Sequence, residues 1–333
     1  MRLFLALLAT AIGTAITVAL IALYGAAGIG AAISGAGWGL LLLIPIHLVQ
    51  TAFSALGWRA LLLPLPYLTL LRLRWIREAV NGLLPVAQIG GDVVRARLLN
   101  AQGVPLPVAG ASVTVDLTVE ITSQIIFTLL GLGLLIRHPE DIATVRWLTG
   151  ATVAAAGVVF LFLLTQHLGG FHLVERLLVR LSGRSNWKAL GDVNGLHAAI
   201  AALYRQPAAL ALSFLHHLIS WLLGGAEVMV ALSLVGVPVG LADALVIESL
   251  GLAAKSVGFA VPGALGVQEG GFILVCGLVG IDPAAAIELS LLKRIREVLL
   301  GIPGLIAWQV SESRSAVRRG RAAAGARPSE MLP

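Results

Sequence analysis

Two carboxylates lie within an otherwise apolar stretch of the chain. Asp116 and Glu120 are four residues apart in the segment ASVTVDLTVEITSQ, so a helix places both on one face. A carboxylate at the middle of a membrane is costly and marks a functional position by default. Because two ionised carboxylates repel each other, we expect one to be protonated or to meet an arginine, with Arg95, Arg294 and Arg296 as candidates. A charge that couples to movement and a structural buried ion pair remain alternative interpretations.

Further ionisable residues interrupt later apolar stretches. His216 and Glu227 are eleven residues apart, close to three helical turns, which predicts a shared face. Arg294 and Glu297 are three residues apart in the segment LLKRIRE and can pair along a helix. A helix–helix hydrogen bond is the alternative for the histidine, and topology-setting flank charges are the alternative for LLKRIRE. The candidate charge and coupling residues are Asp116, Glu120, His216, Glu227, Lys255, Arg294 and Arg296.

Two windows of the chain share an order of residues that would break a membrane helix. Residues 78–92 read EAVNGLLPVAQIGGD, and residues 255–269 read KSVGFAVPGALGVQE. Pro85 and Pro262 are 177 residues apart, and each window continues through glycines to a carboxylate at the same separation. Proline removes a helix hydrogen bond and glycine loosens the backbone. Since transporters place such broken helices at corresponding positions of two halves, we predict an internal repeat.

The two breaks are predicted to bind a polar lipid headgroup. Half-helix N-termini present unpaired N–H groups to anions such as phosphate, and arginines can add charge-assisted hydrogen bonds. The alternative is a kinked helix whose arginines extend to the cytoplasmic surface. The candidate headgroup-binding residues are Asn81, Pro85, Gln88, Gly90, Gly91, Asp92, Arg95, Pro262, Gly266, Gln268 and Glu269.

The elements that must position these residues are membrane helices. Of the 333 residues, 58% are hydrophobic and 12% are charged, about half of the roughly 25% that soluble domains carry. Several uncharged stretches reach the roughly 20 residues that cross a bilayer as a helix. We predict an all-α, polytopic membrane protein of about eight spans, whose two Pro/Gly-interrupted segments, kinked or re-entrant, form the internal repeat. Spans are expected at about 3–25, 38–63, 106–136, 145–167, 208–235, 240–261 and 284–310, with interrupted segments at about 78–100 and 262–281.

The basic residues indicate the orientation of the chain. The net charge is +6, and arginines gather in residues 59–77, in the connection 168–206 and in the tail 313–333. By the positive-inside rule these three regions and both termini are cytoplasmic, so the charge gives no reason to expect a nucleic-acid partner. We expect one transmembrane domain over residues 1–312 and a disordered basic tail over 313–333. No Cys/His or HExxH spacing predicts a metal site, and no cofactor is expected.

Three motifs together resemble a known family. They are GLLPxxxxGGDxxRxRLL from residue 82, VPGxLGVQEGG from residue 261 and LLKRIRE from residue 291. In this order they are similar to the flippase-type transmembrane domain of lysylphosphatidylglycerol synthases, over residues 1–312. The segments VDLTVE and LLKRIRE are closer to a subgroup associated with hopanoid biosynthesis. The chain departs from many members in having Leu117, not arginine, directly after the Asp116 carboxylate.

The resemblance implies a lipid transporter of the bacterial inner membrane. Its partner would be a membrane lipid, a hopanoid or a phospholipid-like molecule, moved towards the outer membrane with hopanoid-synthesis or export proteins as further partners. On this interpretation the protein is not an enzyme. The alternative is an enzyme or enzyme subunit of hopanoid or polyprenyl-lipid synthesis, with the buried carboxylates as general bases and His216 as acid or base.

Overall fold

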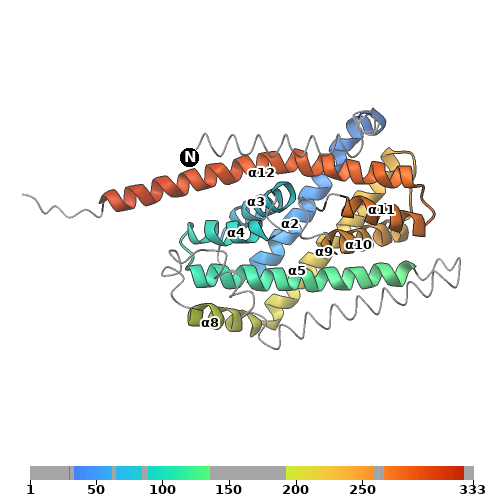
Figure 1. Ribbon diagram of the computed structural model, residues 1–333. Helices are drawn as coiled ribbons and strands as arrows, with labels where there is room; N and C mark the ends of the chain where they lie inside the picture. Colours follow the sequence, from blue (N-terminus) through green and yellow to red (C-terminus); the bar gives the residue numbers. More distant parts are fainter. Residues whose placement is uncertain are drawn as a thin grey trace, which may run out of the picture.

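The structure is a computed structural model that describes residues 30, 34–61, 65–84, 89–135, 193–257, 264 and 266–325. All regular elements in these ranges are helical (Figure 1). They are η1 (Gly37–Leu42), α2 (Leu43–Leu61), α3 (Tyr67–Leu83), α4 (Gly90–Asn100), α5 (Leu106–Leu135), α8 (Val193–Tyr204), α9 (Pro207–Leu234), α10 (Leu241–Val257), α11 (Val267–Leu278) and α12 (Pro283–Gly325). The predicted spans at 3–25 and 145–167, and most of the connection 168–206, lie outside the described residues.

Three helical segments in the described ranges are long and apolar enough to cross a membrane. They are Ser34–Leu61, α5 and α9, each of 28 to 30 residues. These segments match the spans expected at 38–63, 106–136 and 208–235. Helices form there because a backbone in hydrocarbon must satisfy its own N–H and C=O groups. The protein is therefore a polytopic helical membrane protein, while the total of about eight spans stays a prediction.

The two interrupted segments are pairs of separate helices. The first pair is α3, which ends at Leu83, and α4, which begins at Gly90; the second is α10, which ends at Val257, and α11. Leu84 has an extended backbone that ends α3. Gly266 precedes α11 with φ +79°, a conformation that residues with a side chain rarely adopt. Each break therefore has a local backbone cause.

The helices repeat along the chain as the sequence predicts. The starts of α4 and α11 are 177 residues apart, and so are the starts of α5 and α12. Packing repeats as well: α12 packs against α3 as α5 packs against α10, and α4 contacts α3 and α5 as α11 contacts α10 and α12. Gln50 of α2 and Glu227 of α9, also 177 positions apart, hydrogen-bond to each other at 2.7 Å. The two repeats therefore meet at the α2–α9 contact.

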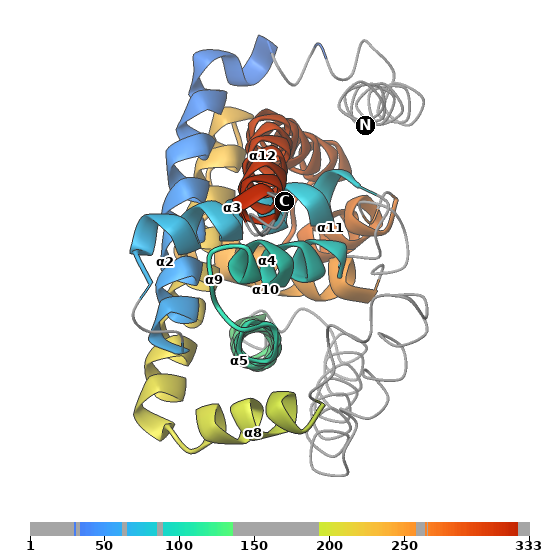
Figure 2. The ribbon, with the colours of Figure 1, turned by 90° about the vertical axis from the view of Figure 1, so that its left-hand side faces the viewer.

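The second repeat is inverted relative to the first. In Figure 1, α5 runs away from the end of the molecule where α4 lies, and α12 runs in the opposite direction, away from the end where α11 lies. Figure 2 shows α2 and α9 side by side, running in opposite directions. The helices α4 and α11 thus lie towards opposite ends of the bundle. Inverted repeats of this kind form substrate sites at their interface in transporters.

One close helix crossing gives a test of the packing. A Cβ on Gly131 of α5 would lie 1.7 Å from Oγ and 2.9 Å from Cβ of the buried Ser249 on α10. We expect Gly131→Ala to destabilise the protein by about 1–3 kcal/mol, the usual effect of overpacking. The matched control is Gly133→Ala, since a Cβ there meets nothing within 4 Å. Thermal unfolding in detergent measures both, and equal midpoints for the two variants would contradict the crossing.

The last helix continues further than predicted. We expected its span to end at about residue 310 and a disordered tail to follow, but α12 extends to Gly325. The added segment SRSAVRRGRAAAG is rich in alanine and arginine, which are among the most favourable residues for helix formation. Composition alone therefore underestimated the helix. Residues 326–333 lie outside the described part of the chain.

Candidate functional site: a charged cavity at the middle of the membrane

A polar cavity of about 260 Å³ lies where the two repeats meet. It is lined by side chains from α2, α3, α5, α9, α10 and α12. His47, Glu120 and Ser220 lie at the midpoints of the three candidate spans, and all three line the cavity. The cavity is therefore near the membrane midplane, where ionisable and polar groups are expensive and mark function.

Equivalent residues of the two repeats face this cavity together. Glu120 and Glu297 are 177 positions apart, and both line it. Glu78 and Lys255 have the same separation and also line it, with the charge inverted. The cavity is thus built from corresponding positions on α3, α5, α10 and α12, which is the expected place for a site between repeats.

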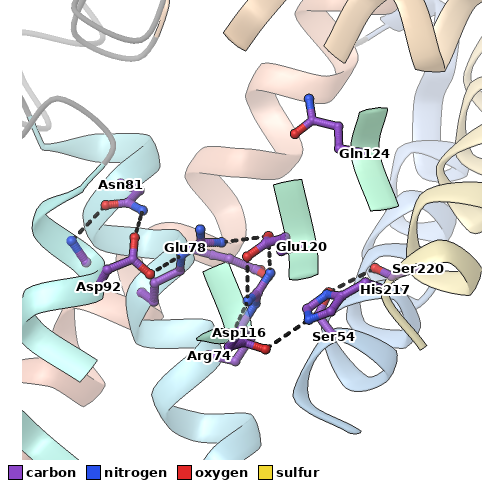
Figure 3. Close-up of polar contacts among 12 residues, drawn as sticks. Ser54, Arg74, Glu78, Asn81, Asp92, Asp116, Glu120, Gln124, His217 and Ser220 are labelled. Carbon is purple, nitrogen blue, oxygen red and sulfur yellow. Dashed lines mark hydrogen bonds and ion pairs between the residues drawn. The ribbon is translucent and has the colours of Figure 1, made fainter. Parts of the chain in front are cut away.

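Arginines of α3 hold the carboxylate contributed by the first repeat. Arg74 donates through Nη1 to Glu120 Oε2 at 3.0 Å, with a second contact to Oε1, and Arg77 Nη1 donates to Oε1 at 3.1 Å. Arg77 Nε also donates to Asp92 of α4 at 3.1 Å, so the same arginine joins α3, α4 and α5. Figure 3 shows Arg74 between Glu120 and Asp116. The buried Arg74 and the partly buried Arg77 therefore hold Glu120 in place.

Asp116 lies behind the cavity in a fully buried cluster. Arg95 Nη1 donates to Asp116 Oδ2 at 2.6 Å, and His217 Nε2 lies 2.9 Å from Oδ1. The Arg95 guanidinium also stacks over the Trp58 ring, 4.7 Å from its centroid. Arg74 Nη1 contacts Asp116 at 3.4 Å and links the cluster to the cavity wall. Arg95 is thus the arginine that Asp116 meets, as one of the sequence alternatives allowed.

The second repeat holds its carboxylate in a similar way with different residues. Glu297 accepts from Lys255 Nζ of α10 at 2.7 Å and from Arg294 Nη1 at 3.1 Å. Arg294 Nε donates to Glu269 of α11 at 3.1 Å. The predicted pairing of Arg294 with Glu297 along the helix is confirmed. Lys255 of α10 therefore has the role in the second repeat that the arginines of α3 have in the first.

A third group of charges connects the two repeats across the cavity. Arg296 Nη2 of α12 lies 2.9 Å from Glu227 Oε1 of α9, and Arg296 Nη1 lies 2.5 Å from His47 Nδ1 of α2. His47 Nε2 is 3.4 Å from Glu78 Oε2 of α3. Gln50 donates to the other Glu227 oxygen. His47 therefore stands between charged groups of both repeats.

The helix breaks themselves are placed differently from our expectation. The Gly91 N–H donates to Asn81 Oδ1 at 2.7 Å, and the Gly266 N–H donates to Glu269 Oε2 at 2.6 Å. These N–H groups are already satisfied by the protein, so they are not free for a headgroup. Asn81 lines the cavity, whereas the other described candidates do not; they are Gly90, Gly91, Asp92, Arg95, Gly266, Gln268 and Glu269. Pro85, Gln88 and Pro262 lie outside the described residues.

The predicted coupling residues divide into three groups. Glu120, Lys255, Arg294 and Arg296 line the cavity. Asp116 and Glu227 contact that lining from behind.

His216, by contrast, bonds to the Leu212 carbonyl and its ring centroid lies 6.1 Å from that of Phe53. Its neighbour His217 joins the charge network instead, because α9 turns Ser213, His217 and Ser220, spaced four and three apart, towards α5 and α2. The eleven-residue spacing between His216 and Glu227 was therefore a poor guide to shared contacts.

Sequence reasoning missed several cavity residues, of which Arg74 and Arg77 are the clearest cases. Arg74 and Arg77 belong to the stretch 59–77, which we assigned to a cytoplasmic loop from its arginines. The structure places them on α3 with Arg74 buried. A usable signal was present: Arg74, Arg77, Glu78 and Asn81 follow the i, i+3, i+4, i+7 pattern of a helix face.

Comparisons with known proteins support a membrane protein whose function is related to lipids. A family model described as "Lysylphosphatidylglycerol synthase TM region" matches residues 7–304. The matched range includes both helix breaks and every residue of the cavity. No curated protein and no solved structure gives a significant match to the chain.

Proposed function

The chain belongs to the family of the lysylphosphatidylglycerol synthase transmembrane region, and from this premise we propose that it binds the polar headgroup of a membrane lipid in the midplane cavity and carries it across the membrane. The observation that supports this most strongly is the charged cavity between two inverted repeats. A headgroup alone cannot cross hydrocarbon at low cost, because its charges lose their hydration. The side chains of the cavity replace that hydration.

The size of the cavity favours a headgroup rather than a whole lipid. Its volume of about 260 Å³ is below the roughly 300–1,000 Å³ of pockets that enclose drug-sized molecules. The acyl or terpenoid tail would therefore stay in the bilayer beside the protein. In this proposal the host membrane is the bacterial inner membrane, with both termini in the cytoplasm.

Unpaired arginine atoms in the cavity wall favour an anionic headgroup. Arg294 Nη2 and Arg296 Nε are buried and have no hydrogen-bond partner in the described part of the chain, and Arg74 Nε has only an ion-pair contact of 3.5 Å to Glu78. All three arginines line the cavity. Guanidinium groups suit phosphate oxygens particularly well. We therefore propose a phosphate-bearing headgroup; a hopanoid, the lipid that the sequence resemblance implies, would need an anionic substituent to use these donors.

A second candidate function is chemical modification of the lipid. Our expectation that the protein is not an enzyme is contradicted by the family match, because the family is named for a synthase. Buried carboxylates such as Asp116 and Glu120 could act as general bases in an enzyme or enzyme subunit. Lipid extracts from cells with and without the protein distinguish the two functions. If the protein modifies a lipid, cells without it lack a lipid species. If it transports a lipid, those cells contain the species but in a different location.

A reconstituted assay tests transport. Purified protein is placed in vesicles with NBD-phosphatidylglycerol, and dithionite then quenches the label on the outer leaflet only. The protein should let dithionite quench label that began in the inner leaflet, unlike empty vesicles.

Arg296→Gln should slow this translocation about tenfold or more, since a charge-assisted hydrogen bond contributes about 1.5–3 kcal/mol. Arg97→Gln is the control, because Arg97 is 63% exposed and pairs with Glu312 outside the cavity. Unchanged transport in Arg296→Gln would exclude the proposed binding position.

A further inference from the structure

The charge network around the cavity does not balance without a proton. Among the described residues it contains eight carboxylates, seven fixed cations and two histidines. The carboxylates are Glu78, Asp92, Asp116, Glu120, Glu227, Glu248, Glu269 and Glu297; the cations are Arg74, Arg77, Arg95, Lys255, Lys293, Arg294 and Arg296. With neutral histidines the network carries one negative charge, and one proton neutralises it. An uncompensated charge in a low-dielectric interior is strongly unfavourable.

Only one of the two histidines is open to the cavity. His217 is fully buried against Asp116, whereas His47 lines the cavity and its side chain is 22% exposed. His47 also has no equivalent histidine in the second repeat. The residue 177 positions later is Gly224, and a Cβ there would lie 2.7 Å from Glu248, which leaves no room for a ring. His47 can therefore exchange a proton with water in the cavity, and the second repeat has no corresponding proton site.

The contacts of His47 define its protonation state. Arg296 can only donate, so its 2.5 Å contact requires an unprotonated Nδ1 and places the ring hydrogen on Nε2, towards Glu78. Glu227 Oε2 lies 3.6 Å from Nδ1. Charged groups thus reach the ring from α3, α9 and α12: two carboxylates and one arginine. The ring is neutral in this arrangement.

We propose that His47 is a proton site that couples proton binding to capture of an anionic headgroup; this rests on the proposed function. A proton from cavity water binds Nδ1 and ends the hydrogen bond from Arg296, since both atoms are then donors. Arg296 Nη1 becomes free beside its unpartnered Nε. The same proton cancels the excess negative charge that would repel the headgroup. Release of the headgroup restores the Arg296–His47 bond and returns the proton to water.

Two measurements test the coupling. In vesicles, translocation of NBD-phosphatidylglycerol by the wild type should rise about tenfold between about pH 8 and pH 5.5, the range in which a histidine titrates. In weakly buffered detergent solution, adding dihexanoylphosphatidylglycerol should cause uptake of about one proton per protein near neutral pH. His47→Gln and His47→Asn should abolish the pH response and the proton uptake. His216→Gln should keep both, because His216 lies outside the network.

The outcomes separate the two proposals. If the wild type moves the labelled lipid at no pH, the proposed function fails and the coupling fails with it. If it moves the lipid but the pH profile and proton uptake are the same in His47→Gln, the coupling alone is wrong. Thermal unfolding of each variant identifies a misfolded protein. If one of the two His47 variants does not fold, proton uptake by the other variant decides whether His47 is the proton site.

Discussion

Replacing Asp116 with asparagine should destabilise the protein by about 3–5 kcal/mol, the cost of removing one partner from a buried ion pair. Asp116 is completely buried and accepts from Arg95 at 2.6 Å, with His217 and Arg74 within 3.4 Å. An amide at this position takes a counter-charge away from two buried guanidinium groups, and leaves Arg95 with Asp92 and Arg74 with Glu120 and Glu78. Thermal unfolding in detergent, followed by circular dichroism, measures the loss.

The control and the rescue variant separate this effect from general sensitivity of the fold. Glu288→Gln removes a carboxylate on α12 that lies outside the cavity and the charge network. Removing the charge and its partner together, in Asp116→Leu with Arg95→Leu, should restore part of the stability that Asp116→Leu loses, since the guanidinium that lost its 2.6 Å contact is then absent as well. An unfolding midpoint for Asp116→Asn equal to that of Glu288→Gln would contradict the buried cluster.

Filling the cavity should abolish lipid translocation without unfolding the protein. Gly82 of α3 lines the cavity, and a Cβ at this position meets nothing within 4 Å. A leucine side chain at Gly82 would occupy space that the headgroup needs. Replacing a helical glycine also favours the helix by up to about 1 kcal/mol, so Gly82→Leu should be as stable as the wild type or more stable. The dithionite assay and thermal unfolding measure the two effects separately.

Gly133→Leu is the matched control for the filled cavity. Gly133 of α5 also has open space around its Cβ position, but it does not line the cavity. It should translocate NBD-phosphatidylglycerol at the wild-type rate. Gly82→Leu protein that folds and still moves the lipid at that rate would show that the headgroup takes another path.

The membrane helices were predictable because their signal is local. The span expected at 106–136 is α5 at Leu106–Leu135, and the span expected at 208–235 is α9 at Pro207–Leu234. In each case a long apolar run has one stable structure in hydrocarbon. The internal repeat was also readable, since Pro85 and Pro262 mark equivalent breaks in both halves.

The contacts of the site were not predictable, because they join residues far apart in the chain. Arg74 looked like a topology-setting loop charge, yet its partner Glu120 is 46 residues later. His216 and His217 are adjacent, and only the packing of α9 against α5 decides that His217 meets Asp116, 101 residues away. Charge and periodicity show which residues need partners, but tertiary packing selects the partners.

The binding position that we propose from the structure differs from the one predicted from the sequence for a similar reason. The sequence suggested free N–H groups at the starts of α4 and α11. Asn81 and Glu269 accept hydrogen bonds from Gly91 and Gly266 there, and so satisfy them within the protein. Side-chain capping of this kind depends on where a preceding or following residue folds back. The headgroup site that we propose therefore lies in the cavity between the two breaks rather than at either one.

Covalent capture of a headgroup tests the central claim most directly. On a Cys276→Ser background, a cysteine replaces either Ser256, which lines the cavity, or Leu274, which is 65% exposed on α11 outside it. Vesicles contain phosphatidylethanolamine with a maleimide headgroup, and mass spectrometry of the intact protein detects the adduct. A headgroup site in the cavity predicts an adduct for Ser256→Cys and none for Leu274→Cys. No adduct for Ser256→Cys, from protein that folds, would contradict the entry of lipid headgroups into the cavity.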